Sequence, residues 1–132
     1  MSTIFSKIIA GEIPCYKIAE NEEFLAFLDI APLEKGHTLV VPKNEIDYIF
    51  DMDDNSLCRM HLFAKSVAKA LRETVPCLRI GVAVIGLEVP HAHIHLVPLQ
   101  NLGSLTFTKE RIKLSATDFE ELAKSISGNF KK

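Results

Sequence analysis

Three of the five histidines in the 132-residue chain stand at alternating positions in one short segment. Ala92 and Ile94 separate His91, His93 and His95. Successive side chains of a β-strand point to opposite faces, so this spacing places three imidazoles on one face, about 6.6 Å apart along the strand. The apolar residues take the other face, which predicts contact with a core. The histidine face needs another explanation, because each imidazole brings two ring nitrogens that require partners when desolvated.

Three uses of such a histidine face are open from the residues alone. The histidines can be solvated strand residues, which is the common case for one isolated histidine. Imidazoles at positions i and i+2 can also ligate zinc. In the third case a neutral imidazole attacks an electrophilic phosphorus or carbonyl carbon while its neighbours bind the oxyanion. Strict alternation of three histidines favours the last two uses. A metal site also needs carboxylates that orient its ligands, and only Glu88 is adjacent in the sequence.

Composition excludes several classes of protein. The 15 Lys and Arg residues nearly balance the 17 Asp and Glu residues, so no basic field is available to bind a nucleic acid polymer. No apolar run approaches the roughly 20 residues that cross a bilayer, and the first residues do not form a secretion signal. The three cysteines include no C-x-x-C motif. We therefore expect one domain over residues 1–132, in the cytoplasm, with reduced thiols and no membrane contact.

Hydrophobic spacing predicts the secondary structure. A short helix is expected over residues 4–9, with Ser2 and Thr3 as possible caps and Gly11 at its end. Short apolar runs predict strands over 16–19, 24–29 and 38–41, and a helical period predicts the principal helix over 54–74. Strands are expected over 79–85 and 91–99, and a capping box at Ser115 and Asp118 opens a C-terminal helix that stops before Gly128. The fold class is α+β, with a mostly antiparallel five-stranded sheet.

Four segments together resemble one known family. The pattern His-x-His-x-His followed by two apolar residues, at 91–97, is similar to the signature of the histidine triad (HIT) family of nucleotide-binding proteins, hydrolases and transferases. Residues 4–14, 27–32 and 36–43 are similar to the opening segment of that family and to two of its strands. The resemblance covers residues 4–98 in the order and spacing of the family. It leaves 99–132 as a C-terminal extension of unassigned role.

The resemblance implies a role for each histidine. His93, the middle histidine, would be the nucleophile that takes the nucleotidyl group from the substrate. His91 would hold the tautomer and the electrostatics of the site, and His95 would bind a phosphoryl oxygen. His37 would complete the cluster. A hydrogen bond from one ring nitrogen of His93 to a backbone carbonyl would leave its other nitrogen with a free lone pair.

The resemblance also implies nucleotide contacts. Asp29 matches the acid that binds the ribose hydroxyls. The apolar positions that enclose the base match Ile4, Phe5, Ile8, Phe27 and Ile30. Some relatives carry two cysteines for a structural zinc in the opening segment, where this chain has Thr3 and Ser6. No metal or other cofactor is therefore expected.

The chain departs from the family before the triad. The family commonly has a glutamine and a hydroxyl residue where Leu87 and Glu88 stand, so Glu88 replaces a group that contacts the phosphate or the leaving group. We predict a nucleotide hydrolase or nucleotidyl transferase for phosphoramidates, acyl nucleotides or dinucleoside polyphosphates. A weakly catalytic or regulatory nucleotide-binding protein is the alternative, and a three-histidine zinc hydrolase is a third possibility. A homodimer is expected, because Cys58 and Leu62 widen the apolar face of the principal helix.

Overall fold

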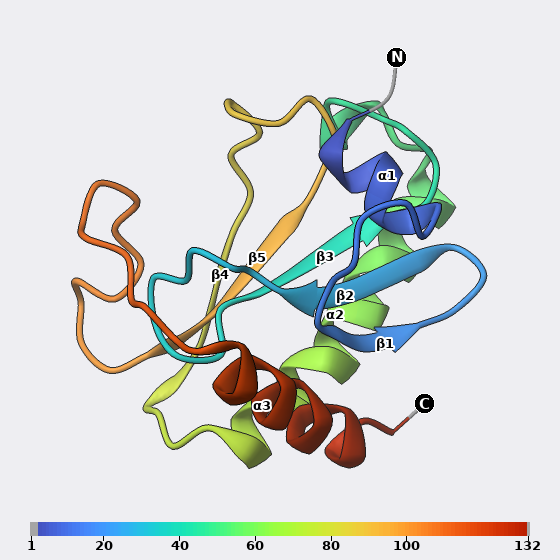
Figure 1. The fold of residues 1–132 in the computed structure, drawn as a ribbon. Helices are drawn as coiled ribbons and strands as arrows, with labels where there is room; N and C mark the ends of the chain where they lie inside the picture. The colour runs from blue at the N-terminus through green and yellow to red at the C-terminus, as the bar shows by residue number, and fades with distance from the viewer. Residues whose placement is uncertain (1–2, 132) are drawn as a thin grey trace.

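The computed structural model describes residues 3–131, in which three α-helices and one 3-10 helix accompany an antiparallel sheet of five strands (Figure 1). The strands lie in the order β1-β2-β3-β5-β4. Their bounds are β1 Lys17–Glu20, β2 Phe24–Leu28, β3 Thr38–Pro42, β4 Arg79–Ala83 and β5 Ile94–Leu99. The helices are α1 Ile4–Ile9, α2 Asp54–Thr74 and α3 Ala116–Asn129, with the 3-10 helix η1 at Ile49–Asp51. The predicted α+β class is confirmed, and η1 is an addition to it.

Each α-helix begins at a side chain that accepts a hydrogen bond from one of its free backbone N–H groups. The Thr3 hydroxyl accepts from the Ser6 amide at the start of α1, whereas Ser2 lies outside the described residues. Asp53 caps α2, and the predicted capping box of Ser115 and Asp118 opens α3. Gly128 is part of the last turn of α3, so that helix runs slightly further than expected.

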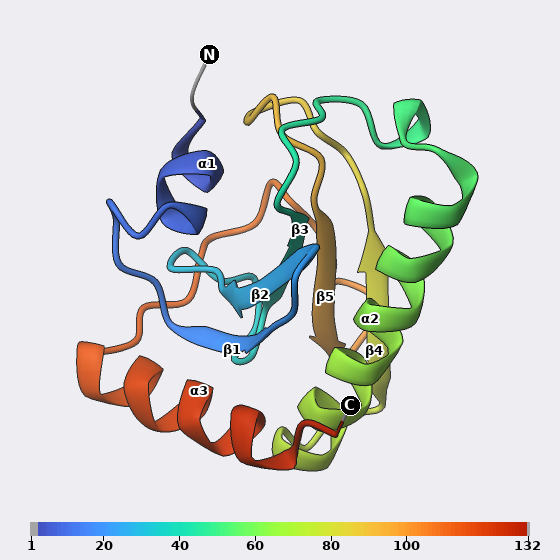
Figure 2. The ribbon, with the colours of Figure 1, turned by 90° about the vertical axis from the view of Figure 1, so that its right-hand side faces the viewer.

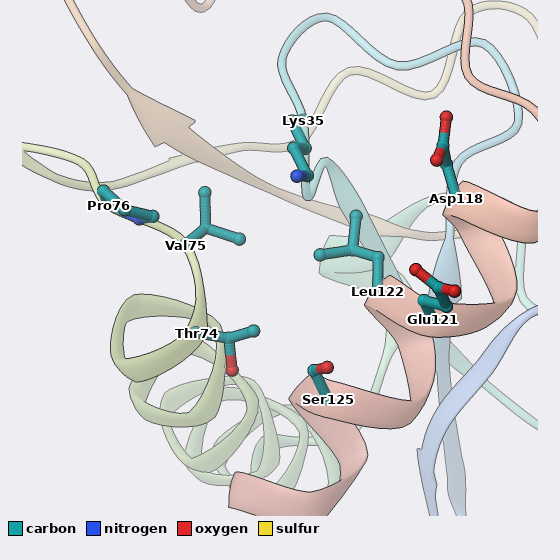
Figure 3. Close-up of a pocket in the computed structure, with 8 residues that line it drawn as sticks. All are labelled: Lys35, Thr74, Val75, Pro76, Asp118, Glu121, Leu122 and Ser125. Carbon is teal, nitrogen blue, oxygen red and sulfur yellow. The ribbon is translucent and has the colours of Figure 1, made fainter.

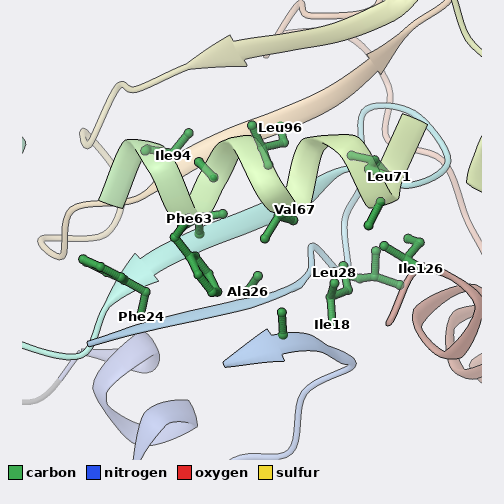
Figure 4. Packing of buried hydrophobic residues seen from close by; sticks show 14 of the residues in the cluster. Ile18, Phe24, Ala26, Leu28, Phe63, Val67, Leu71, Ile94, Leu96 and Ile126 are labelled. Carbon is green, nitrogen blue, oxygen red and sulfur yellow. The ribbon is translucent and has the colours of Figure 1, made fainter. Parts of the chain in front are cut away.

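One face of the sheet packs on α2 to form the main core. Alternation along β2, β3 and β5 directs Ala26, Val40, Ile94 and Leu96 to this face, where Val67 of α2 lies among them (Figure 4). Ile126 of α3 extends the same cluster past the end of α2. The apolar period of α2 thus meets the alternation of the strands. No helix among the described residues is long and apolar enough to span a membrane.

The opposite face of the sheet carries a second apolar cluster under α1. Figure 2 shows α2 on one side of the sheet and α1 on the other. Leu25 and Phe27 of β2 and Leu39 and Val41 of β3 alternate with the residues that face α2, and they pack against Phe5. These strands are therefore buried on both faces, and their second face leads into the histidine cluster.

The histidine strand begins later than the sequence predicts. We expected a strand over 91–99, but β5 starts at Ile94, so His91 and His93 precede it. The register that pairs Val40 with Ile94 would pair Pro42 with position 92. Proline has no N–H group for the ladder, and the Ala92 amide instead donates to the Ile46 carbonyl at 2.6 Å. The other strands differ from their expected bounds by one or two residues.

Candidate active site

His93 is held by a hydrogen bond that decides its tautomer. Its Nδ1 lies 2.7 Å from the backbone carbonyl oxygen of His91. Because a carbonyl oxygen only accepts, Nδ1 carries the proton and Nε2 keeps its lone pair. The ring is 7% exposed and packs edge-on against Phe5, with 5.0 Å between ring centroids. The predicted geometry, with a proton on one nitrogen and a free lone pair on the other, is present.

His91 is fully buried and ties α1 to the end of β3. Its Nε2 donates to the Pro42 carbonyl oxygen at 2.8 Å, which leaves Nδ1 to accept from the Thr3 hydroxyl at 3.1 Å. Both ring nitrogens therefore have protein partners. No pattern in the sequence indicates Thr3 as a partner of His91, since the contact joins positions 88 residues apart. His91 fixes the turn whose carbonyl orients His93.

His37 and His95 form a directed hydrogen-bond chain. The Leu33 amide donates to His37 Nδ1 at 3.0 Å, so the proton of His37 is on Nε2. That nitrogen lies 3.0 Å from His95 Nδ1, which must accept. His95 therefore carries its proton on Nε2. The chain makes His95 a hydrogen-bond donor and leaves His93 an acceptor, although their rings are only 4.8 Å apart between centroids.

Burial keeps the three clustered imidazoles neutral. It is the main cause that lowers the pKa of His37 to about 3 and the pKa of His95 to about 4. Neighbouring histidines and Arg111 lower both pKa values further. Burial also lowers the pKa of His93, and the hydrogen bond to the His91 carbonyl opposes this shift. At neutral pH the site thus contains one imidazole lone pair beside one imidazole N–H.

A cavity of about 490 Å³ opens in front of His93 and His95. It is lined by every residue predicted to contact the nucleotide: Ile4, Phe5, Ile8, Phe27, Asp29, Ile30 and Glu88. Two of these apolar side chains remain notably open to solvent, Ile30 at 72% and Ile4 at 48%. Exposed aliphatic groups on the wall of a cavity suit a planar apolar ligand such as a nucleobase.

Asp29 lies at the turn after β2, on the wall of this cavity. Its Oδ1 accepts from the Ala31 amide at 2.9 Å, and its Oδ2 lies 3.7 Å from His37 Nε2. Burial raises the pKa of this carboxyl, and the Ala31 hydrogen bond opposes the rise. Asp29 keeps acceptor capacity for hydroxyl groups of a ligand.

A metal would have to use a different set of ligands from the three histidines of the motif. Among the described residues, ligand atoms of Asp29, His37 and His95 lie within 4.8 Å of one another. In that group His37 Nδ1 already accepts from an amide, and its Nε2 is bonded to His95. His91, with both nitrogens paired, is not part of it. The alternation of the three histidines therefore does not create a common ligand sphere.

The C-terminal extension supplies cavity residues that the sequence analysis did not identify. Phe107, Thr108 and Arg111 line the cavity. The Phe107 ring lies edge-on to His95, with 4.7 Å between centroids. This segment has no helical or strand period, so no pattern in the sequence indicates its position.

A second, smaller hollow of about 250 Å³ lies between the end of α2 and α3 (Figure 3). Its lining includes Thr74 of α2 and the carboxylates of Asp118 and Glu121 on α3. Asp118 is engaged in the capping box. None of the predicted site residues lies there.

Comparisons with known proteins agree with the fold and the motif. The HIT domain profile matches residues 10–102. Adenosine 5'-monophosphoramidase hnt1 of Schizosaccharomyces pombe is 41% identical over 102 residues, which cover 76% of this chain and 77% of the relative. The Saccharomyces cerevisiae HNT1 enzyme of the same name is 36% identical over 122 residues, covering 92% and 76%.

A solved structure gives the same result for the fold. The crystal structure of a Hit-like protein involved in cell-cycle regulation from Bartonella henselae, with an unknown ligand, has a TM-score of 0.84 and 29% identity. The match covers 98% of this chain and 96% of that one. The chain belongs to the histidine triad family, and the predicted resemblance is confirmed.

Proposed function

We propose that this protein is a nucleotide hydrolase or nucleotidyl transferase that forms a covalent intermediate on His93. The observation that carries the proposal is the bond from His93 Nδ1 to the His91 carbonyl, which leaves Nε2 as a lone pair at the cavity. Two relatives that are adenosine 5'-monophosphoramidases support a nucleoside phosphoramidate as one substrate class. Acyl nucleotides and dinucleoside polyphosphates present the same type of phosphorus centre.

The proposed reaction has two displacements at phosphorus. His93 Nε2 attacks the α-phosphorus, a P–N bond forms, and the bond to the leaving group breaks. The leaving amine departs with the electron pair and takes up a proton. Water then attacks the phosphorus of the intermediate, which releases the nucleoside monophosphate and restores the imidazole. The transfer reaction uses another acceptor in place of water.

The hydrogen bonds around the cluster suit both displacements. Phosphorylation of Nε2 makes the His93 ring cationic while Nδ1 still donates to the His91 carbonyl, so this oxygen stabilises the developing charge. The Nε2–H of His95, which the chain from Leu33 through His37 determines, is a donor for a phosphoryl oxygen. Asp29 would bind the ribose hydroxyls, and the apolar wall would enclose the base. These groups need no metal ion for the displacement.

Trapping of the intermediate tests the proposal. The protein is mixed with less than one equivalent of adenosine 5'-phosphoramidate labelled with ³²P, quenched in base within one turnover and digested. An acid-labile adduct of adenylate mass on the peptide that contains His93 is expected. His61→Ala is the matched control, because His61 is exposed on α2 and away from the cavity. An adduct that survives in His93→Ala would overturn the assignment.

A regulatory protein that binds a nucleotide without efficient turnover is the second candidate. It is favoured by the position of Leu87 and Glu88, which line the cavity where the family commonly has an amide and a hydroxyl group. Leu87 is 88% exposed, so it does not serve the core. Tight binding of a nucleoside monophosphate with no adduct and no release of the leaving group would favour this candidate.

We also propose that the protein is a homodimer through α2 and β4. Leu62 of α2 and Val82 of β4 are 63% and 58% exposed. β4 is an edge strand, and its register with β5 places Val82 on the face of the sheet that α2 covers. A second copy would cover this apolar surface and the open edge together.

A further inference from the structure

The connection between β5 and α3 reaches the cavity from outside the segment that matches the family. The HIT domain match ends at residue 102, whereas Phe107 and Arg111 lie beyond it and line the cavity. Figure 2 shows this connection crossing the side of the sheet that carries α1. Any role of Arg111 is thus a property of this chain and does not follow from the histidine motif.

Arg111 is fixed in place at the cavity wall. Its Nη1 donates to the Ala31 carbonyl at 2.8 Å and its Nη2 to the Phe107 carbonyl at 3.4 Å. The guanidinium carbon lies 5.8 Å from the centre of the Phe107 ring, and this ring packs on His95. The next amide, that of Ile112, donates to the Pro32 carbonyl at 2.9 Å. The side chain is therefore held between the turn after β2 and the ring beside His95.

No carboxylate among the described residues is hydrogen-bonded to Arg111, although its charge is close enough to Asp29 to oppose the rise that burial causes in the pKa of that carboxyl. Within residues 3–131, its hydrogen-bond partners are the two carbonyl oxygens, which carry no formal charge. Two of its five N–H groups are used, so three remain. Arg111 is the one cation among the described residues that line the cavity, because His93 and His95 are neutral there. A fixed cation on a cavity wall attracts an anion.

We propose that Arg111 is a substrate-binding residue that pairs with the phosphate of the nucleotide, next to the His95 donor. This proposal rests on the proposed function, since it names the group that binds the anionic part of the same substrate. The neutral histidines supply the nucleophile and one hydrogen bond, and they leave the negative charge of the phosphate unbalanced. A guanidinium supplies that balance with two parallel hydrogen bonds, which an ammonium group cannot reproduce.

The test compares the binding of AMP with the binding of adenosine by isothermal titration calorimetry on the full chain. Arg111→Gln should weaken the binding of AMP by roughly ten-fold or more and leave the binding of adenosine within about two-fold, because a charge-assisted pair is lost. Arg111→Lys should lie between Arg111→Gln and the wild type. Lys109→Gln is the matched control, since Lys109 is a cation of the same segment that pairs with Glu34 outside the cavity. It should bind both ligands as the wild type does.

Two outcomes would overturn the role of Arg111. An equal loss of AMP and adenosine binding would mean that Arg111 only holds the segment against Ala31. Unchanged AMP binding in both Arg111 variants would mean that the phosphate lies elsewhere. Thermal unfolding of each variant shows whether the fold is intact, and Arg111→Lys answers the question if Arg111→Gln does not fold. If the wild type binds neither ligand, the proposed function itself fails, and the role of Arg111 fails with it.

Discussion

The two faces of the sheet differ in how completely the neighbouring helices and connections cover their side chains. On the side of α2, the side chains of β2, β3 and β5 are apolar and fill the space beneath the helix. On the side of α1, the same strands present Leu39 and His95 to a space that is only partly filled. His93 and Ile94 are neighbours in the chain, yet one lines a cavity and the other is completely buried in the core.

This difference shows how much the alternation of side chains along a β-strand can specify. It assigns residues to a face, but it does not say whether that face is closed. The core side is closed because α2 provides an apolar stripe along 21 residues. The other side is covered by α1, which has only six residues, and by a connection without regular structure. The space between these two covers is the cavity.

The largest effect is expected for His93→Ala. This change removes the attacking nitrogen, so nucleotidyl transfer should be abolished, while nucleotide binding should stay within a few-fold. Rapid-quench measurement of leaving-group release checks the rate, and calorimetry with AMP checks binding. His95→Ala should be milder, because it removes one donor to the phosphate. Residual transfer in His93→Ala comparable to that of His95→Ala would contradict the division of roles.

Ile94→Ala should lower the stability of the fold and have little effect on activity, the reverse of His93→Ala. Ile94 is 0% exposed on the α2 side, so its truncation leaves a cavity and should lower the free energy of unfolding by about 2–5 kcal/mol. Urea denaturation measures the loss. Activity well below the unfolding temperature should change far less than in His93→Ala. If His93→Ala proves the more destabilising of the two, then it is wrong that the face toward α2 mainly determines stability and the face toward α1 mainly determines activity.

Acid should weaken the fold through the histidine side. The unfolded chain binds protons on histidine below pH 6.5, whereas His37 and His95 stay neutral in the folded state until their pKa values of about 3 and about 4. The unfolded state therefore binds more protons in this window, and stability falls as the pH is lowered through it. The slope is about 1.4 kcal/mol per pH unit for each such histidine. Asp29 opposes the trend near pH 4, because burial raises the pKa of its carboxyl.

Urea denaturation at pH 7, 6 and 5 measures this slope. His37→Gln should reduce it, whatever the variant does to the stability at pH 7. His61→Gln, on the exposed surface of α2, is the matched control and should keep the wild-type slope. An identical slope in all three proteins would show that the buried histidines do not cause the loss.

The core side could be predicted from the sequence almost completely. The period of α2 gave its bounds, 54–74, without error. Seven residues predicted to contact the nucleotide line the cavity, as do His93 and His95, whereas Ile13, Cys15, Leu39 and Val89 are lining residues that were not predicted. The predicted strand start at His91 was wrong, because β5 begins at Ile94, and this start depends on Pro42, which lies 52 positions away and has no N–H to continue the ladder.

The closing wall of the cavity could not be predicted. Arg111 is held by carbonyl oxygens of Ala31 and Phe107, and any residue type supplies a carbonyl oxygen. The directed chain from Leu33 to His95 likewise starts at a backbone amide. Patterns of side chains identify faces and motifs, whereas backbone partners across a turn become visible only in the folded chain.

Leu62→Glu tests the exposed outer surface of α2. The inner surface of this helix is buried, while Leu62 is exposed and belongs with Val82 of β4 to the apolar surface that we propose a second copy covers. A carboxylate placed in a dimer interface loses its hydration, so the dimer should dissociate at least about ten-fold more readily. Light scattering over micromolar concentrations measures the mass, and Lys124→Glu, at an exposed position of α3 outside the proposed interface, provides the charge control. A monomeric wild type would refute the dimer.

The smallest effect is expected at the rim of the cavity, for the double change Leu87→Gln with Glu88→Ser. Burial mainly sets the lowered pKa of His93, but Glu88 is near enough for its charge to raise that pKa. The same charge repels an anionic substrate, at a cost of about 1 kcal/mol in bulk water and about 4 kcal/mol near a protein surface, for a separation of about 4 Å. Removing it should raise kcat/KM on adenosine 5'-phosphoramidate by roughly ten-fold, since each decade corresponds to about 1.4 kcal/mol.

The single changes separate the effect of the lost Glu88 charge from the effect of the amide gained in Leu87→Gln. A rate that falls in Glu88→Ser would mean that Glu88 assists the reaction, as a proton donor to an amine leaving group would. In that case the rim is tuned toward catalysis, and the regulatory candidate loses the observation that favours it.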